Sequence, residues 1–224
     1  LRAVDRKWQG GHSPARRIVL IANVVVYLAM ELIPEKMMSF PLYNIDLSYT
    51  EQTLFKWWQP ITYMFMHGGF SHLFFNMFSL WMFGRALEWE LGAKRFLIYY
   101  FVCGIGAAIV QLGVAQIDLA STELWSPAWI AYMQTPTVGA SGAIFGLLLA
   151  FGMIYPNAVI TMIFPPISMK AKWFVMIYGI LELLLGVSGR MDNVAHFAHL
   201  GGMFCGWLLM LWWRHRDRKR IYYY

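Results

Sequence analysis

Long apolar stretches alternate with short polar segments along this chain. Six stretches consist almost wholly of aliphatic, aromatic and small residues, and they cover about residues 18–33, 70–89, 96–117, 139–155, 171–187 and 194–213. A helix needs roughly 20 apolar residues to cross the hydrocarbon core of a bilayer. An outer-membrane barrel would instead show polar and apolar residues alternating in strands of roughly ten residues. The pattern predicts an all-α polytopic membrane protein with six transmembrane helices.

Two prolines and one aromatic segment mark the connections between these helices. Pro34 stops the first apolar stretch and Pro156 stops the fourth, because proline removes a backbone donor and clashes with the preceding turn. The segment 34–67 is too aromatic for a plain linker. Amphipathic aromatic rings favour the boundary between lipid and water, so we expect this segment to lie partly in that interface through these side chains: Phe55, Trp57, Trp58 and Tyr63.

The composition excludes a soluble enzyme and a disordered chain. Hydrophobic residues make up 59% of the sequence and charged residues only 13%, whereas soluble domains have about 45–50% and about 25%. The aromatic fraction of 17% is too high for a disordered chain. The net charge of +6 is gathered at the chain ends and between the apolar stretches. We therefore expect contacts with membrane lipid and no nucleic-acid partner.

The basic residues predict the orientation, because six spans leave both chain ends on one side. The ends carry Arg2, Arg6, Lys7, Arg16, Arg17, Arg214, Arg216, Arg218, Lys219 and Arg220. The turns after the second and fourth spans add Arg85, Lys94, Arg95, Lys170 and Lys172. The opposite side receives only Lys36, Lys56 and Arg190. The positive-inside bias predicts a cytoplasmic segment 1–17, a six-span membrane domain 18–213 and a basic cytoplasmic tail 214–224.

Polar side chains inside the apolar stretches gather at one membrane depth. In the predicted orientation they occupy the extracytoplasmic ends of the second, fourth and sixth spans: His67, His72, Asn76, Ser141, His196 and His199. Polar groups in lipid are costly and often functional. Their convergence predicts a site built from three distant parts of the chain.

Ser141 lies in the sequence Gly139-Ala140-Ser141-Gly142, at the first turn of the fourth span. Backbone amides at a helix start favour negative charge, which suits a nucleophile whose attack creates an oxyanion. The span is only ~25 Å long against ~30 Å of hydrocarbon, so Ser141 is expected below the outer membrane surface. The alternative is a structural hydroxyl that bonds back to its own helix.

A serine needs a base to become nucleophilic, and His199 is the best placed histidine. Gly202 and Gly206 follow it, and the fourth span offers Gly142 and Gly146. If these glycine faces pack together, the His199 ring comes close to Ser141. The alternatives are that the glycines serve packing alone, and that His196, one turn earlier, is the base instead of a structural residue.

His72 and Asn76 are four residues apart and share one helix face. Both side chains donate hydrogen bonds, so together with the Ser141 amide they form a candidate oxyanion hole. The alternative is a polar pair that joins two helices.

The H-x-x-H pattern of His196 and His199, with His67 and His72 as further ligands, is a candidate metal site. The H-E-x-x-H pattern of zinc proteases is absent, and no acidic residue or cysteine is adjacent in the sequence. We therefore expect no metal and no cofactor. The acidic residues in or near the spans look isolated or close to helix ends, which disfavours an aspartyl protease: Glu31, Glu88, Glu90 and Glu182.

Three motifs in order resemble the rhomboid family of intramembrane serine proteases. They are His-Gly-Gly-Phe-Ser-His-Leu-Phe-Phe-Asn at 67–76, Gly-Ala-Ser-Gly at 139–142, and Ala-His-Leu-Gly-Gly at 198–202 followed by Gly206. The resemblance extends from the first span to the last. It implies a six-span rhomboid-like bundle that cuts transmembrane protein substrates in or near a span, with small residues near the cut and lateral access beside the fifth span.

The resemblance also implies roles for individual residues. It implies a serine–histidine dyad with no acidic third member, with Ser141 as nucleophile and His199 as base. His72 and Asn76 would stabilise the oxyanion. Active-site support would come from Phe145, which packs on the base where family members often have tyrosine, and from Gly139, His67 and His196.

Two other functions compete with a protease. One is a catalytically inactive rhomboid-like protein that binds membrane clients, which would require the two catalytic residues to be absent or out of reach. The other is an unrelated six-helix transporter or channel, which would show repeats or broken helices with charges at the midplane. The expected location is the bacterial cytoplasmic (inner) membrane, and the sequence leaves the oligomeric state open.

Overall fold

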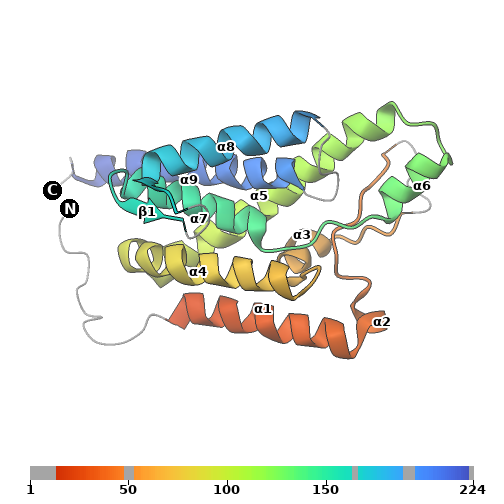
Figure 1. Ribbon diagram of the computed structural model, residues 1–224, viewed down its shortest axis with the longest axis horizontal. Helices are drawn as coiled ribbons and strands as arrows, with labels where there is room; N and C mark the ends of the chain where they lie inside the picture. The colour runs from red at the N-terminus through yellow and green to blue at the C-terminus, as the bar shows by residue number, and fades with distance from the viewer. Residues whose placement is uncertain (1–13, 48–52, 163–165, 189–194, 222–224) are drawn as a thin grey trace.

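The computed structural model describes residues 14–47, 53–162, 166–188 and 195–221, with side chains up to residue 217 (Figure 1). The predicted segment 1–17 therefore lies mostly outside the described residues, as do Arg190 and the end of the predicted tail. The described chain is mostly helical. Its elements are α1 (Pro14–Leu32), α2 (Pro34–Met37), α3 (Gln59–Thr62), the 3-10 helix η2 (Tyr63–Phe65), α4 (Phe70–Leu91), α5 (Ala93–Ala120), α6 (Pro127–Gln134), α7 (Ser141–Ile154), β1 (Val159–Thr161), β2 (Ser168–Lys170), α8 (Ala171–Ser188) and α9 (His196–Ile221).

Six of these helices occupy the positions of the six predicted spans: α1, α4, α5, α7, α8 and α9. By length and composition, α5 and α8 qualify as membrane-crossing helices within the described chain, and α7 is a shorter apolar helix. The mostly helical architecture is confirmed. The crossing of a membrane by all six helices stays a prediction.

The helix ends follow local sequence signals in most cases. Gly92 alone separates α4 from α5, with φ at +77°, a conformation that glycine adopts without steric cost. The helix α7 ends at Ile154, two residues before Pro156. By contrast, α9 continues to Ile221, well beyond the predicted end of the apolar stretch. Lysine and arginine are good helix formers in water, so the charged residues end the apolar stretch without ending the helix.

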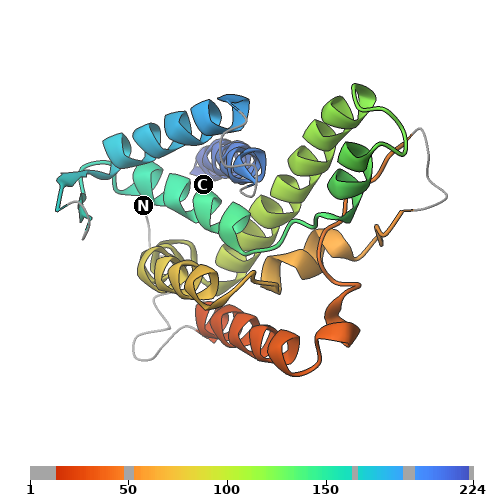
Figure 2. The ribbon, with the colours of Figure 1, turned by 45° about the vertical axis from the view of Figure 1, so that its right-hand side comes forward.

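The helices form a layered bundle around α9. This helix packs most extensively against α5 and α7, which also pack against each other. The helix α8 covers α7 and α9 on one side, while α4 and α1 lie on the other, and α5 crosses the bundle obliquely (Figures 1 and 2). The fully buried side chains at the centre come largely from α5 and α7 and include Phe96, Tyr99, Tyr100, Cys103 and Leu147.

The contact between α7 and α9 is made by glycines. A methyl group added to Gly202 would overlap the carbonyl group of Gly142, and one added to Gly146 would lie 3.1 Å from the Gly202 oxygen. The two helix backbones therefore touch directly, as helices do where small residues face each other. The predicted approach of the two helices is confirmed for Gly202, whereas Gly206 faces Tyr99 and Cys103 of α5 instead of α7. The Gly202–Gly142 contact fixes the distance between the first turns of α7 and α9.

The segment between α1 and α4 is folded onto the bundle and is only partly interfacial. Trp57 is 80% exposed, in keeping with the predicted interface. Tyr63 is only 2% exposed, and its hydroxyl donates a hydrogen bond to the Gly104 carbonyl at 2.6 Å. The expectation for Tyr63 was wrong, because a buried partner for the hydroxyl allows the whole ring to enter the core.

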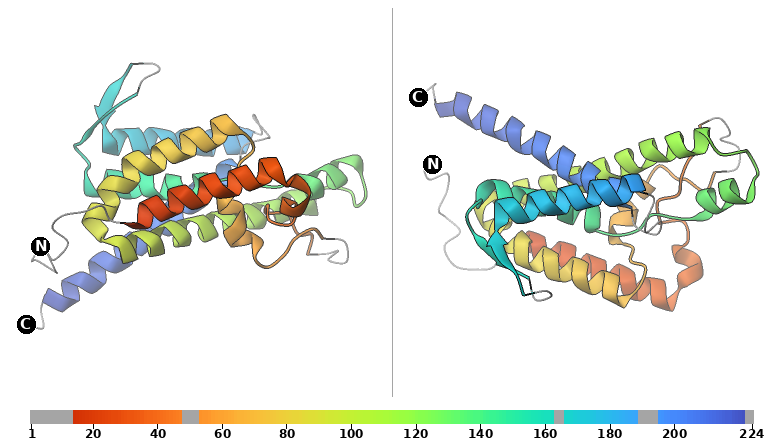
Figure 3. Two further views of the ribbon diagram at one scale, coloured as in Figure 1. Left: turned by 90° about the horizontal axis from the view of Figure 1, so that it is seen from below. Right: turned by 45° about the horizontal axis from the view of Figure 1, so that its top comes forward.

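Several charged parts of the chain lie at one end of the bundle. The start of α1, the end of α9 and the β1–β2 hairpin, which pairs Ile160 with Met169, project from the same end (Figures 1 and 3). At this end the Arg95 guanidinium of α5 donates two hydrogen bonds, of 2.9 and 3.0 Å, to the Asp217 carboxylate of α9. The arrangement groups the predicted cytoplasmic charges together.

The backbone contact predicts that Gly202→Ala destabilises the protein. The added methyl group has no room against the Gly142 carbonyl, and overpacking costs roughly 1–3 kcal/mol. Gly113→Ala in α5 is the matched control, because nothing lies within 4 Å of a Cβ there. We expect a lower melting temperature in detergent for Gly202→Ala and an unchanged or higher one for Gly113→Ala. Equal melting temperatures would contradict the close contact of the two helices.

Candidate active site

Ser141 and His199 meet where α7 and α9 begin. Ser141 is the first residue of α7, and His199 lies in the first turn of α9. The distance from Ser141 Oγ to His199 Nε2 is 2.8 Å, which is a hydrogen bond in the range required of a nucleophile and its base. His199 is 8% exposed and Ser141 is partly buried. The structure thus brings together the two residues that the sequence singled out.

The ring of Phe145 holds the imidazole of His199 in place. The two rings are stacked with centroids 4.2 Å apart and an angle of 9° between their planes. Phe145 lies one turn after Ser141 on the same helix, so α7 supplies both the hydroxyl and the surface against which the base packs. The predicted packing is present without the hydroxyl that a tyrosine would add.

His72 points its Nε2 atom at the backbone next to Ser141. The Gly68 amide donates to His72 Nδ1 at 3.3 Å, so a neutral ring carries its proton on Nε2. A Cβ at Gly139 would lie 2.8 Å from His72 Nε2 and 3.5 Å from Ser141 Oγ. Gly139, with φ at +126°, therefore leaves the space that borders both the donor and the hydroxyl.

Asn76 lies on the same face of α4, one turn further along, and is 6% exposed. Its amide nitrogen donates a hydrogen bond of 2.8 Å to the His72 carbonyl. One amide proton is thus committed to the helix backbone, and the amide group carries a second. The structure brings Asn76 beside His72, and its part in binding an oxyanion stays a prediction.

His67 lies before α4, outside the long helices, and is 1% exposed. Its ring packs edge-on against His72 with centroids 5.1 Å apart, and its Nδ1 lies 3.3 Å from the Phe65 carbonyl. Burial, together with the neighbouring His72 ring, lowers the pKa of His67 to about 4. This ring is therefore neutral at pH 7, and it supports His72 by packing and not by charge.

An acidic residue lies beside the two histidines of α9, and the sequence interpretation did not place it there. Glu182 Oε2 lies 2.9 Å from His199 Nδ1 and 2.7 Å from His196 Nδ1. The interpretation of Glu182 as isolated or close to a helix end was wrong, because its carboxylate contacts both histidines. The physical reason is that α8 packs against the first turn of α9 and turns Glu182 inward, which the spacing of residues along either helix does not reveal.

A signal for Glu182 was nevertheless present in the sequence. It is the only acidic residue in α8, and its neighbours Leu181, Leu183 and Leu184 are 46%, 48% and 60% exposed. A carboxylate in an otherwise apolar candidate span needs a partner. The histidines of the sixth span were the polar groups at the same predicted depth.

The same three side chains could be considered as metal ligands. Their ligand atoms all lie within 4.8 Å of one another. The two carboxylate–imidazole distances of 2.7 and 2.9 Å are hydrogen-bond distances, whereas ligand atoms around tetrahedral zinc lie about 3.3 Å apart. The spacing favours hydrogen bonds, and the expectation of a metal-free site stays a prediction.

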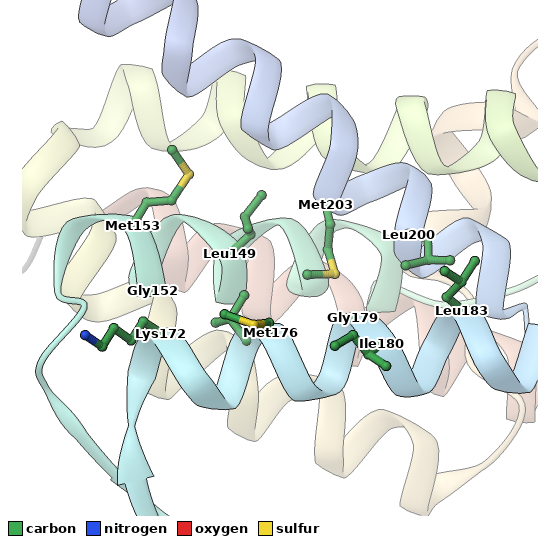
Figure 4. Close-up of a pocket in the computed structure, with 11 residues that line it drawn as sticks. Leu149, Gly152, Met153, Lys172, Met176, Gly179, Ile180, Leu183, Leu200 and Met203 are labelled. Carbon is green, nitrogen blue, oxygen red and sulfur yellow. The ribbon is translucent and has the colours of Figure 1, made fainter.

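An apolar groove adjoins the site between α7, α8 and α9 (Figure 4). It has a volume of about 480 Å³. Its lining includes Leu149, Met176, Gly179, Ile180, Leu200 and Met203. One of its lining residues, Leu200, directly follows His199 in α9.

Comparison with known proteins shows the family of this chain. Residues 54–216 match the family model described as the rhomboid domain. The chain is 33% identical over 155 residues to RHOMBOID-like protein 5 of Arabidopsis thaliana, covering 69% of this chain and 44% of that protein. It is 29% identical over 157 residues to Rhomboid protease AarA of Providencia stuartii, covering 69% of this chain and 55% of that protein.

A third relative is matched over more of its own length. Putative rhomboid protease YdcA of Bacillus subtilis (strain 168) is 33% identical over 169 residues, covering 75% of this chain and 70% of that protein. The chain spans about half the length of the first two curated relatives it matches. The family match covers every residue of the site described above, and this chain belongs to the rhomboid family.

Proposed function

We propose that this integral membrane protein is an intramembrane serine endopeptidase that hydrolyses peptide bonds in or near the transmembrane segments of other proteins. The observation that carries the proposal is the 2.8 Å contact between Ser141 Oγ and His199 Nε2 at the start of two helices. Membership of a family whose relatives include rhomboid proteases supports the same reaction.

The first half of the reaction forms an acyl-enzyme. Ser141 Oγ attacks the carbonyl carbon of the scissile bond while His199 Nε2 takes the hydroxyl proton. The new Oγ–C bond produces a tetrahedral intermediate with a negative oxygen. This intermediate collapses as the C–N bond breaks, and the leaving amine takes the proton from His199 Nε2.

The second half restores the enzyme. A water molecule gives a proton to His199 Nε2 and attacks the ester carbonyl, and the second tetrahedral intermediate releases the carboxylic acid product as Ser141 Oγ regains its proton. Water must therefore reach Ser141, which the partial burial of this residue at a helix start supports.

The oxyanion is stabilised by donors from two helices. The Ser141 amide lies at the positive end of α7, and His72 Nε2 borders the same space beside Gly139. Asn76 is the further donor. Preorganised donors of this kind are worth several kcal/mol in a site shielded from water.

Transmembrane proteins are the proposed substrates, and membrane lipid surrounds the enzyme. A helical peptide bond is protected by its own hydrogen-bond ladder, so a substrate segment must unwind before Ser141 reaches it. The proposed topology has six spans with both termini in the cytoplasm. The proposed location is the bacterial cytoplasmic membrane. The start of α1, with Arg16 and Arg17, and the end of α9, with Arg214 and Arg216, lie at one end of the bundle, whereas α7 and α9 begin away from that end (Figure 1), which supports this orientation.

A catalytically inactive client-binding protein is the second candidate function. It requires a nucleophile and base that are missing or out of reach. Both residues are present here and in hydrogen-bond contact, which favours the protease.

Replacement of either member of the pair should abolish proteolysis. Purified protein in detergent or liposomes is incubated with a generic transmembrane substrate, and cleavage is followed on gels. We expect the wild type to cut and Ser141→Ala and His199→Ala to be inactive with unchanged melting temperatures. A fluorophosphonate should label the wild type at Ser141. Substrate cleavage by Ser141→Ala, or undiminished labelling of that variant, would reject the proposal.

Removal of the His72 donor should slow the chemical step. Loss of one oxyanion donor costs about 10²- to 10³-fold in kcat, so His72→Ala should lower kcat by that factor with little change in KM. His72→Gln, whose amide can still donate, should recover part of the rate. If His72→Ala raises KM and leaves kcat unchanged, His72 binds substrate and does not stabilise the oxyanion.

A further inference from the structure

We propose that Glu182 is a positioning residue for His199, with one carboxylate oxygen that accepts hydrogen bonds from both His199 and His196. This inference rests on the proposed function. It extends the two-residue mechanism to a chain of hydrogen bonds from the hydroxyl through the imidazole to the carboxylate. Glu182 Oε2 lies 2.9 Å from His199 Nδ1, and the opposite ring nitrogen lies 2.8 Å from Ser141 Oγ.

The carboxylate selects the tautomer that catalysis needs. A base that receives the Ser141 proton on Nε2 must carry its own proton on Nδ1. An ionised carboxylate only accepts hydrogen bonds, so Glu182 favours the Nδ1–H form of His199 and orients the free Nε2 lone pair toward the hydroxyl. The stack of Phe145 on the ring fixes the remaining rotation.

The electrostatic setting of α9 makes a counter-charge necessary. His196 and His199 both lie in the first turn of this helix, where the helix dipole is positive and disfavours a cationic ring. Proton transfer from Ser141 creates such a ring. The Glu182 carboxylate offsets the dipole at the nearer ring nitrogen and lowers the free energy of the imidazolium in the transition state.

Burial indicates that the carboxylate is held in a defined place. Glu182 is 9% exposed although the neighbouring leucines of α8 are about half exposed. A buried carboxylate without partners is strongly destabilising, and two imidazole donors on one oxygen satisfy it. His196 therefore acts on Glu182 and through it on His199.

Few other titratable groups face this cluster among the described residues. His72 from α4 interacts electrostatically with His199, α7 contributes the Ser141 hydroxyl, and α9 contributes His196. The other charged residue of α8 is Lys172, at the opposite end of that helix. The charge that His199 experiences thus comes mainly from Glu182.

The test compares Glu182→Gln with the wild type in the transmembrane-substrate assay. Glutamine keeps the shape and an accepting oxygen but removes the charge. We expect kcat to fall about 10²- to 10⁴-fold with KM unchanged, because Glu182 touches no substrate. The acidic limb of kcat/KM against pH should move to lower pH, since the imidazolium has lost its counter-charge. Glu182→Asp should recover part of the rate.

Glu88→Gln is the matched control. Glu88 is also a buried carboxylate on a long helix, at 4% exposure, and its Oε1 accepts a hydrogen bond from the Arg16 amide away from the site. We expect wild-type kcat and pH dependence for this variant. Wild-type kinetics for Glu182→Gln, or equal losses in both variants with equal falls in melting temperature, would overturn the proposal.

A readout independent of proteolysis separates this inference from the proposed function. In protein with ¹⁵N-labelled histidine, the hydrogen-bonded Nδ1–H protons of His196 and His199 should give downfield resonances that Ser141→Ala keeps and Glu182→Leu loses. If these resonances persist in Glu182→Leu, the inference fails even where the enzyme cleaves. If the wild type cleaves nothing while Glu182→Leu loses the resonances, the proposed function fails and the carboxylate contact stands.

Discussion

The direct backbone contact between α7 and α9 is the constraint on which the site depends. The hydrophobic effect does not drive helices together within lipid, so their close approach requires small residues and good packing. Gly142 and Gly202 provide this approach, and a single added methyl group would overlap the opposing carbonyl. Because both helices begin at the same end of the bundle (Figure 1), the contact holds their first turns together. The 2.8 Å distance between the Ser141 hydroxyl and the His199 ring is a consequence of that backbone separation.

The sequence predicts most of the helices and most of the site, from the apolar stretches and from the free-energy cost of polar groups in lipid. Apolar stretches locate the helices, and polar residues inside them draw attention because each is expensive in lipid. The glycines after His199 predict the approach of α9 to α7, which Gly202 makes, although Gly206 faces α5. The sequence does not predict where α9 ends, since charged residues terminate an apolar stretch without breaking a helix. It also does not predict the burial of Tyr63, since the Gly104 carbonyl that accepts its hydrogen bond lies 41 residues away.

Glu182 shows a different limit of sequence reasoning. The rotation of α8 about its own axis relative to α9 determines whether this carboxylate faces lipid or the histidines, and no repeat within either helix encodes that rotation. The structure supplies it through packing: a Cβ at Gly186 would lie 3.1 Å from the Phe197 ring and 3.3 Å from His196 Cβ. This close approach, one turn beyond Glu182, turns its side chain toward the first turn of α9.

A carboxylate shared by two imidazoles has a further physical consequence. If His196 is neutral, Glu182 presents its full charge to His199 and stabilises the imidazolium that forms during the reaction. If His196 is protonated, the carboxylate is already paired, and less of its field reaches His199. The reactivity of Ser141 therefore depends on His196, a histidine that contacts Glu182 but not Ser141. The His196 Nε2 atom is buried without a hydrogen-bond partner among the described residues, so a proton on that atom would be an unsatisfied buried donor. The arrangement keeps the charge of Glu182 available to the base.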